Sequence, residues 1–146
     1  MIDHARIREL IPHAGSMCLI ESVTAWDESQ IECLVVNHTA TDHPLRHLNR
    51  LSAVHLIEYA AQAAAIHGAL SNESNGKKAE PGMLVAVRDC ELLQETIDKL
   101  TNPLCVTARK KLANNDGLIY EFVIAASDQT PLAKGRLSVM LARSPT

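Results

Sequence analysis

A glutamate stands among apolar and small side chains near the middle of the chain, and a glutamine follows it four residues later. These residues are Glu58 and Gln62, and a separation of four puts both on one side of a helix. Removing water from around a carboxyl group favours its neutral form, which can donate a proton near neutral pH. Glu58 is therefore a candidate general acid, unless it pairs with His55 three residues earlier. Gln62 could orient the carboxyl group, contact a substrate, or be a satisfied buried amide.

Three histidines lie in the polar stretch before this helix, at positions 38, 43 and 47. Histidine titrates near neutral pH, so His38 and His43 are candidate proton acceptors. His43 is also suited to a plain turn, because it precedes Pro44 and a residue before proline is extended. The trio suggests a metal site as well, but Pro44 interrupts helical ligand spacing and no carboxylate pattern completes a set. We therefore expect no metal.

Motifs for several other chemistries are absent from the sequence. It contains no Gly-x-Ser-x-Gly elbow, no phosphate loop and no dinucleotide fingerprint, so we expect no nucleotide cofactor and none of another kind. The four cysteines are far apart in apolar stretches, which is typical of small core residues rather than of zinc or redox pairs. They are Cys18, Cys33, Cys90 and Cys105.

Composition narrows the possible partners and location. Leu, Ile, Val and Phe supply 38 of the 146 residues, enough for a core, whereas aromatic residues make up only 3%. A net charge of −3 without a basic block argues against nucleic acid binding. No apolar run is long enough for a signal peptide or a membrane span, so we expect a cytoplasmic protein with reduced thiols.

The candidate acid lies in the one long helix that the sequence predicts, Leu51–Leu70. Ser52 is the expected N-cap, and Gly68 with Ser71-Asn72 is expected to end the helix. The segment is apolar or small on nearly every side, which predicts burial all round. A sheet wrapped around an alanine-rich helix would provide that burial.

The remaining chain predicts strands joined by short turns. We expect a short helical turn at Ile7–Ile11 and loops over Asn37–Arg50 and Asn72–Pro81. Glu95–Leu100 is expected to form a turn or a short helix. Turns at Asn114–Gly117 and Asp128–Pro131 make the last three strands antiparallel neighbours. We expect one α+β domain spanning residues 1–146. The predicted strands are Met17–Trp26, Ile31–Val36, Met83–Leu93, Leu104–Leu112, Leu118–Ala126 and Leu132–Ala142.

This order of elements resembles the hotdog fold, and the helix resembles that of the bacterial 3-hydroxyacyl-carrier-protein dehydratases. In that family a loop histidine precedes Phe-Pro-Gly, and a Pro-Gly-Val turn opens a helix reading roughly Glu-Ala-Met-Ala-Gln. Glu58 and Gln62 keep the family's spacing, but the Pro-Gly-Val turn is lost. The corresponding segments here are Asp42-His43-Pro44-Leu45, Ser52-Ala53-Val54 and Ile57-Glu58-Tyr59-Ala60-Ala61-Gln62.

A narrower resemblance is to the hotdog dehydratase subunits of aryl-polyene pathways. The similar segments are residues 11–19, Pro44-Leu45-Arg46 and Ile57–Leu70. Such members often carry Asn just before Pro-Leu-Arg and a histidine several residues upstream, where this chain has His43 and His38. The resemblance therefore leaves open which histidine is catalytic, and it admits a heterodimer in which a second hotdog subunit supplies the histidine.

The resemblance implies dehydration of 3-hydroxyacyl groups carried by phosphopantetheine on an acyl carrier protein, in fatty-acid-like or aryl-polyene biosynthesis. It makes His43, or else His38, the base and Glu58 the acid. Backbone N–H groups near Ala53 and Val54, at the helix start, would polarise the thioester carbonyl.

Two other functions stay open at this point. A hotdog thioesterase could use the same carboxylate to activate water. A non-catalytic hotdog subunit could instead shape a partner's acyl tunnel, in a heterodimer rather than a homodimer.

Overall fold

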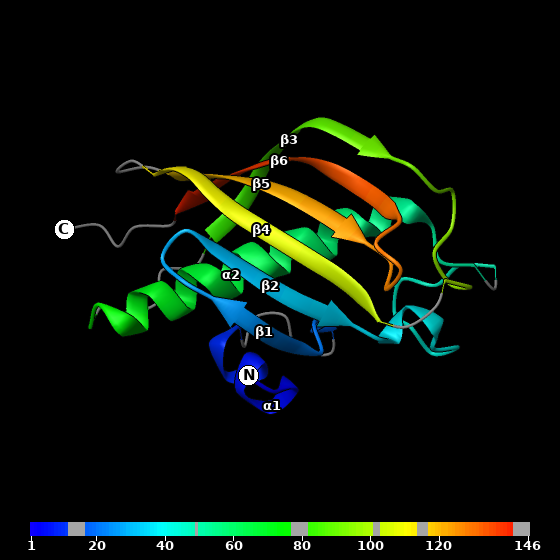
Figure 1. Cartoon of the computed structure of the whole chain (residues 1–146), viewed down its shortest axis with the longest axis horizontal. Helices are drawn as coiled ribbons and strands as arrows, with labels where there is room; N and C mark the ends of the chain where they lie inside the picture. Colours follow the sequence, from blue (N-terminus) through cyan, green and yellow to red (C-terminus); the bar gives the residue numbers. More distant parts are fainter. Residues whose placement is uncertain (12–16, 49, 77–81, 101–102, 114–116, 142–146) are drawn as a thin grey trace.

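The computed structural model contains one antiparallel six-stranded sheet that curves around a single long helix (Figure 1). It describes residues 1–11, 17–48, 50–76, 82–100, 103–113 and 117–141. The predicted α+β architecture with one long helix is confirmed. In spatial order the strands are β1 (Ser22–Trp26), β2 (Gln30–Val35), β4 (Leu104–Ala113), β5 (Gly117–Ala125), β6 (Pro131–Leu141) and β3 (Gly82–Leu92).

The β4–β5–β6 meander is antiparallel, as the short predicted connections require. Side chains alternate along β5, so that Tyr120, Phe122 and Ile124 are buried while Val123 points outward and is exposed. The buried face of the sheet packs on the long helix α2 (Leu56–Ser74), chiefly through β2, β4 and β5. The core therefore lies between the concave face of the sheet and this helix.

The prediction that α2 is buried on every side holds for most of the helix but not for one side, where Ile57, Glu58, Ala61, Ala65 and Gly68 are only half-buried. No residue from Leu56 to Asn72 is exposed in the single chain. The predicted boundaries were wrong by several residues at both ends. The chain first forms a 3₁₀ turn, η3 (Ala53–His55), which Ser52 caps by accepting a hydrogen bond from Val54 N–H.

The far end of α2 lies beyond Gly68, which the helix accommodates without interruption. A Cβ atom added at Gly68 would meet no other element within 4 Å, so no close packing forces a turn there. The helix ends at Ser74, where Asn75 caps the last carbonyls and Gly76 adopts a φ of 67°. A glycine with positive φ just past the last turn is the usual way to end a helix.

The first strand is shorter than predicted. Residues 17–21 of the expected strand Met17–Trp26 lie outside any strand, and β1 begins at Ser22. The reason is tertiary: Leu19 N–H donates to the side chain of Gln62 on α2 at 2.8 Å instead of to a neighbouring strand. The segment before β1 is therefore bound to the helix.

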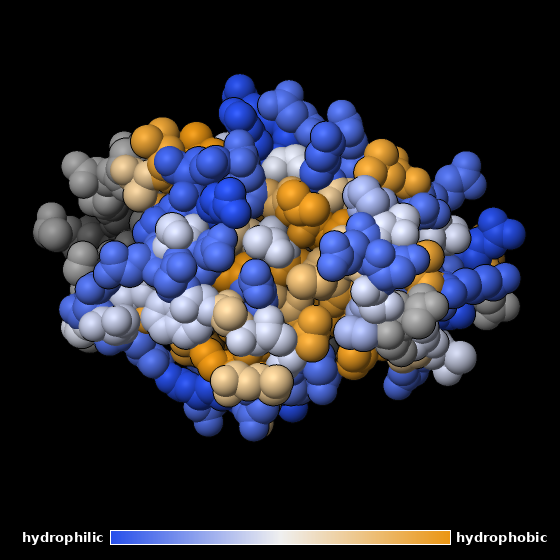
Figure 2. All heavy atoms as spheres, in the orientation of Figure 1, coloured by the Kyte–Doolittle hydropathy of each residue, from blue (hydrophilic) through white to orange (hydrophobic). Residues whose placement is uncertain are grey.

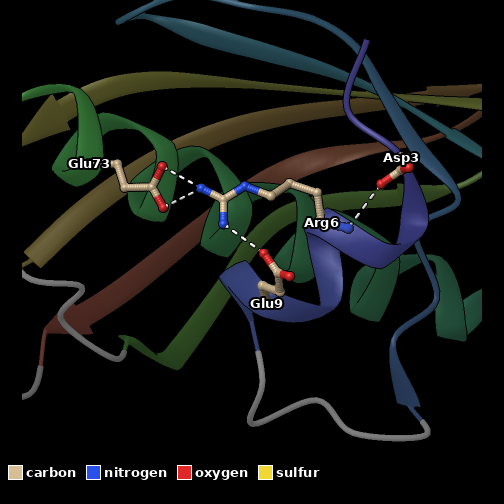
Figure 3. A network of polar contacts seen from close by, with 4 residues as sticks. All are labelled: Asp3, Arg6, Glu9 and Glu73. Atoms are coloured by element: carbon tan, nitrogen blue, oxygen red, sulfur yellow. Dashed lines mark hydrogen bonds and ion pairs between the residues drawn. The ribbon is translucent and has the colours of Figure 1, made fainter.

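The N-terminal helix α1 (His4–Leu10) buries Ile7 and Leu10 and contacts α2. Asp3 caps α1 by accepting from Arg6 N–H at 2.9 Å (Figure 3). The Arg6 guanidinium reaches Glu9 on its own helix and both carboxylate oxygens of Glu73 in the last turns of α2. These ion pairs are exposed, so they orient α1 more than they stabilise the fold.

The surface in Figure 2 is a mosaic, with hydrophobic residues visible in the middle of a largely hydrophilic face. Within the described ranges, no helix is both long enough and apolar enough to span a bilayer.

Several predictions fall outside the described residues: the turn at 114–116, residues 77–81 of the loop after α2, and Ala142 at the end of the last strand. The segment between α1 and Met17 that contains His13 is also outside them.

Candidate active site

Glu58 and Gln62 lie one turn apart on α2 and contact each other. Gln62 Nε2 donates to Glu58 Oε1 at 3.0 Å. Glu58 is half-buried in the single chain, whereas Gln62 is buried. Among the described residues Gln62 is the sole hydrogen-bond partner of the Glu58 carboxyl, and no ion pair links Glu58 to His55. The carboxyl group is thus oriented by an amide rather than neutralised by a cation.

The orientation of the Gln62 amide follows from its other partners. Leu19 N–H can only donate, so it fixes Oε1, and Met17 C=O can only accept, so it fixes Nε2. One N–H of Gln62 Nε2 donates to Met17 O and the other donates to Glu58, so both donors of the Gln62 amide are used. The geometry therefore supports orientation of Glu58 as a role of Gln62, while its contact with a substrate stays a prediction that would have to use the second lone pair of Oε1.

His43 is buried in the loop before α2, and both of its ring nitrogens have partners. Nδ1 accepts from Leu45 N–H at 3.1 Å, so the proton of the neutral ring is on Nε2. Nε2–H donates to the Tyr59 hydroxyl at 2.9 Å, and that hydroxyl donates to Asn37 Oδ1 at 3.4 Å. Burial lowers the pKa of His43, and the positive charges of His55 and Arg46 lower it further.

His38 lies in a 3₁₀ turn, η2 (Asn37–Thr39), and its side chain is fully buried. Nε2 is 2.9 Å from Leu100 O, so Nε2 carries the proton and donates it. Nδ1 is buried without a hydrogen-bond partner among the described residues. Burial lowers the pKa of His38, although the bond to Leu100 O opposes this shift. The neutral ring keeps one unused lone pair.

The loop that carries both histidines is tied to the segment after β3. Arg46 Nη1 donates to Ala40 O at 3.3 Å, and Arg46 Nη2 lies 3.8 Å from the buried carboxylate of Asp98. Asp98 Oδ1 accepts from Leu51 N–H at 3.2 Å. Burial by itself raises the pKa of Asp98, but the Leu51 N–H bond and the Arg46 charge outweigh it, so this pKa lies below its usual range.

The backbone donors expected at the start of the helix are occupied in the single chain. Ala53 N–H donates to Glu95 O at 2.9 Å, and Val54 N–H donates to Ser52 Oγ at 3.3 Å. The residues after β3 therefore pair with the segment that enters α2. A role for these two N–H groups on a thioester oxygen stays a prediction and requires that the present bonds be exchanged.

No group of three or more His, Cys, Asp or Glu side chains that could hold a metal ion occurs among the described residues. The four cysteines are free, and burial raises the pKa of Cys33 to about 12, which suits a core thiol and not a nucleophile. Sequence reasoning missed Tyr59 and Leu100 as partners of the two histidines. Tyr59 directly follows Glu58 in the helix, but nothing in the sequence marks a backbone carbonyl such as Leu100 O.

A comparison with protein families identifies the family of this chain. A family model described as ApeP dehydratase matches residues 5–145, almost the whole chain. The chain belongs to the ApeP-like dehydratase family. The matched range contains Glu58, Gln62, both loop histidines and every strand of the sheet.

Solved structures show the fold of this member of the ApeP-like dehydratase family to be the predicted hotdog fold. The dehydratase heterocomplex ApeI:P from Xenorhabdus doucetiae superposes with a TM-score of 0.83 at 20% identity, covering 94% of this chain and 91% of that one. A mutant thioesterase from Pseudomonas aeruginosa gives 0.68 at 13% identity, covering 96% and 94%. A hypothetical thioesterase from Streptococcus pneumoniae, solved with coenzyme A, gives 0.62 at 10% identity, covering 86% and 88%. No curated protein sequence matches this ApeP-like chain.

Proposed function

We propose that this ApeP-like dehydratase removes water from 3-hydroxyacyl thioesters attached to an acyl carrier protein. The observation that carries the proposal is the Glu58 carboxyl, held on a buried helix by Gln62 within a chain of a dehydratase family. The Glu58 carboxyl is oriented by Gln62 and has no cationic partner within the described ranges, which suits a general acid. The sequence resemblance supports a substrate from fatty-acid-like or aryl-polyene biosynthesis.

The proposed reaction converts a 3-hydroxyacyl thioester into a 2-enoyl thioester and water. A histidine takes a proton from Cα, and the electron pair of the broken C–H bond forms the Cα=Cβ double bond. The Cβ–O bond breaks, and the departing hydroxide takes the proton of the Glu58 carboxyl and leaves as water. Proton exchange with solvent then restores the starting states, so the cycle requires no oxidant, metal or nucleotide.

We propose further that a second hotdog chain completes the site. Large apolar side chains stay exposed around the entrance to α2, although Ser52 and Ala53 pair there with the residues after β3. Val54 is 48% exposed and Leu93 is 47% exposed. Exposed apolar groups near the start of the helix that carries Glu58 are typical of a surface that a partner covers. The solved ApeI:P structure is a heterocomplex, and we expect this chain to pair with a different hotdog subunit.

The test is the Glu58→Gln variant, assayed alone and with a co-expressed hotdog partner on 3-hydroxydecanoyl-N-acetylcysteamine. Enoyl formation, followed by absorbance, should fall by about 10²-fold or more, because the amide cannot donate the acid proton in the same way. The matched control is Glu28→Gln, which changes an exposed glutamate in the β1–β2 turn and should leave the rate unchanged.

The same incubation separates the two catalytic classes. Dehydration releases no free thiol, whereas a thioesterase releases one thiol for each substrate consumed. Thiol release without enoyl product, abolished by Glu58→Gln, would replace dehydration with hydrolysis. Full enoyl formation by the Glu58→Gln variant would remove Glu58 from the mechanism.

A further inference from the structure

The turn just before the segment that enters η3 displays an apolar side chain in an unfavourable backbone conformation. His47 N–H donates to Arg50 O at 2.8 Å and Arg50 N–H donates to His47 O at 2.9 Å, so these two residues close a tight turn. Leu48, the first residue inside the turn, has a φ of 50° and is 82% exposed. A single exposed leucine is common on protein surfaces, but a leucine in the left-handed region is not.

The conformation of Leu48 is not repaid by packing. The left-handed region is costly for residues with a Cβ, and tight turns of this kind favour Gly, Asn or Asp. The other two non-glycine residues with positive φ in the described ranges, Asp89 and Gln129, are both polar. Most of the Leu48 side chain remains in water, so a polar residue would suit this turn better. Backbone strain that the fold does not require is found mainly at functional positions.

Both flanks of the turn are tied to one buried carboxylate. Arg46, just before the turn, lies 3.8 Å from Asp98 Oδ2, and Leu51, just after it, donates its N–H to Asp98 Oδ1 at 3.2 Å. Arg46 Nη1 also donates to Ala40 O at 3.3 Å. A turn that is held on both sides presents its tip in one position, which lowers the entropy cost of binding a partner.

The tip is basic although the chain as a whole is acidic. Residues 46–50 contain three basic side chains and no acid, whereas the chain has a net charge of −3. Arg46 faces inward to Asp98, but His47 and Arg50 are exposed, and neither side chain has a hydrogen bond or an ion pair within the described ranges. An acidic partner is therefore repelled by the net charge of this chain and attracted to this turn.

We infer that Leu48 and Arg50 form a docking site for an acidic acyl carrier protein. Leu48 would enter an apolar depression of the carrier, and Arg50 would lie beside carboxylates at the rim of that depression. The inference rests on the proposed dehydration and adds to it the surface that the carrier contacts. The turn belongs to the loop that leads into α2, and Leu48 precedes Glu58 by ten residues, which suits delivery of a tethered acyl group to that carboxyl.

The experiment replaces Leu48 by Asn, which suits the turn and removes the apolar tip. Because Asn tolerates the left-handed region, Tm should rise by about 2–4 °C. For the full chain, with its hotdog partner where activity requires one, kcat/KM on 3-hydroxydecanoyl carrier protein should fall by about tenfold or more. On 3-hydroxydecanoyl-N-acetylcysteamine, which lacks the carrier, kcat/KM should be unchanged. A lower Tm with equal losses on both substrates would show a purely structural role and overturn the inference.

Leu112 offers a matched control, because it is also an exposed leucine, on β4, and its φ is not positive. Leu112→Asn should leave both kcat/KM values unchanged and should not raise Tm. Arg50→Gln tests the charge: KM for the carrier-bound substrate should rise, and it should depend less on salt than KM of the unmutated protein does. A salt dependence unaltered by Arg50→Gln would contradict the role of Arg50.

A binding measurement separates docking from catalysis. Calorimetry with a fatty-acid acyl carrier protein that lacks its phosphopantetheine should give a Kd about tenfold weaker for Leu48→Asn than for the unmutated protein. Equal Kd values, or no binding by the unmutated protein, would overturn the inference, and so would a variant that loses its hotdog partner but keeps the carrier. An unmutated protein that forms no enoyl product from the N-acetylcysteamine thioester fails the proposed function itself, whereas the effect of Leu48→Asn on carrier binding remains measurable.

Discussion

Gln62 donates to Glu58 Oε1 at 3.0 Å while its other amide atoms hold Met17 O and Leu19 N–H. One side chain thus links the segment before β1, the helix and the candidate acid. The Glu58 carboxyl group is positioned by the Gln62 amide, which cannot rotate without breaking its two hydrogen bonds to backbone groups.

Replacing Gln62 by Leu should affect both stability and catalysis. Two buried backbone groups, Met17 C=O and Leu19 N–H, would lose their partner, which costs about 2–4 kcal/mol of unfolding free energy. Glu58 would lose its orienting donor, and kcat should fall by about 10-fold to 100-fold with a smaller change in KM. Urea unfolding and steady-state kinetics measure the two effects. Unaltered kcat in a folded variant would show that Glu58 does not depend on Gln62.

Asp98 should make its contribution to stability as an anion. Its folded-state pKa lies below the ordinary value of 3.8, so the stabilisation is complete above about pH 4 and is lost as pH falls through the folded value. Asp98→Ala leaves Leu51 N–H without its acceptor and Arg46 without its carboxylate partner, and should cost about 2–3 kcal/mol. Asp98→Asn can still accept from Leu51 N–H and should cost less. Equal unfolding free energies for the two variants would contradict this account.

His67 should make the fold sensitive to mild acid. Burial lowers the pKa of His67 below 6.5; the bond to Asp27 O opposes this shift, and the Lys110 charge adds to it. The neutral ring therefore stabilises the fold above about pH 6.5, and this contribution is lost as pH falls through the lower folded value. His67→Gln removes one titrating group, so the slope of unfolding free energy against pH should decrease by up to about 1.4 kcal/mol per pH unit. The unfolding free energy should still depend on pH in this variant, because burial lowers the pKa values of His38 and His43 too.

Gly135 should resist substitution where Gly68 accepts it. A Cβ at Gly135 would lie 3.0 Å from Cys90 Cα, and 3.0 Å from Cε1 of the buried Phe122 ring. Gly135→Ala should therefore cost about 1–3 kcal/mol, since neither the backbone of β3 nor the packed ring can move freely. Gly68→Ala places its methyl in open space inside α2 and should stabilise the protein by about 0.5–1 kcal/mol. Thermal unfolding of the two variants should shift in opposite directions.

The elements of this protein were largely predictable because their patterns are local. The alternation in β5, the turn between β5 and β6 and the long alanine-rich segment around Glu58 each depend on residues close together in the chain. The same holds for the spacing of Glu58 and Gln62 on one face of the helix. The start of the first strand was predicted wrongly because it depends on a partner far away in the sequence. Leu19 N–H donates to Gln62 instead of to a neighbouring strand, so β1 begins only at Ser22.

By itself the sequence determined an α+β hotdog chain with a carboxyl group on a buried helix and two histidines in the loop before it. Local side-chain periodicity and turn chemistry are sufficient for the α+β class and the long helix, whereas the hotdog fold followed from the resemblance to a known family. Only the tertiary structure decided the state of each side chain, because the partners lie far away along the chain. Leu100 is 62 residues from His38, Tyr59 is 16 residues from His43 and Leu19 is 43 residues from Gln62. A hydrogen bond consumes a particular lone pair, and which lone pair is consumed depends on which distant group the fold brings beside it.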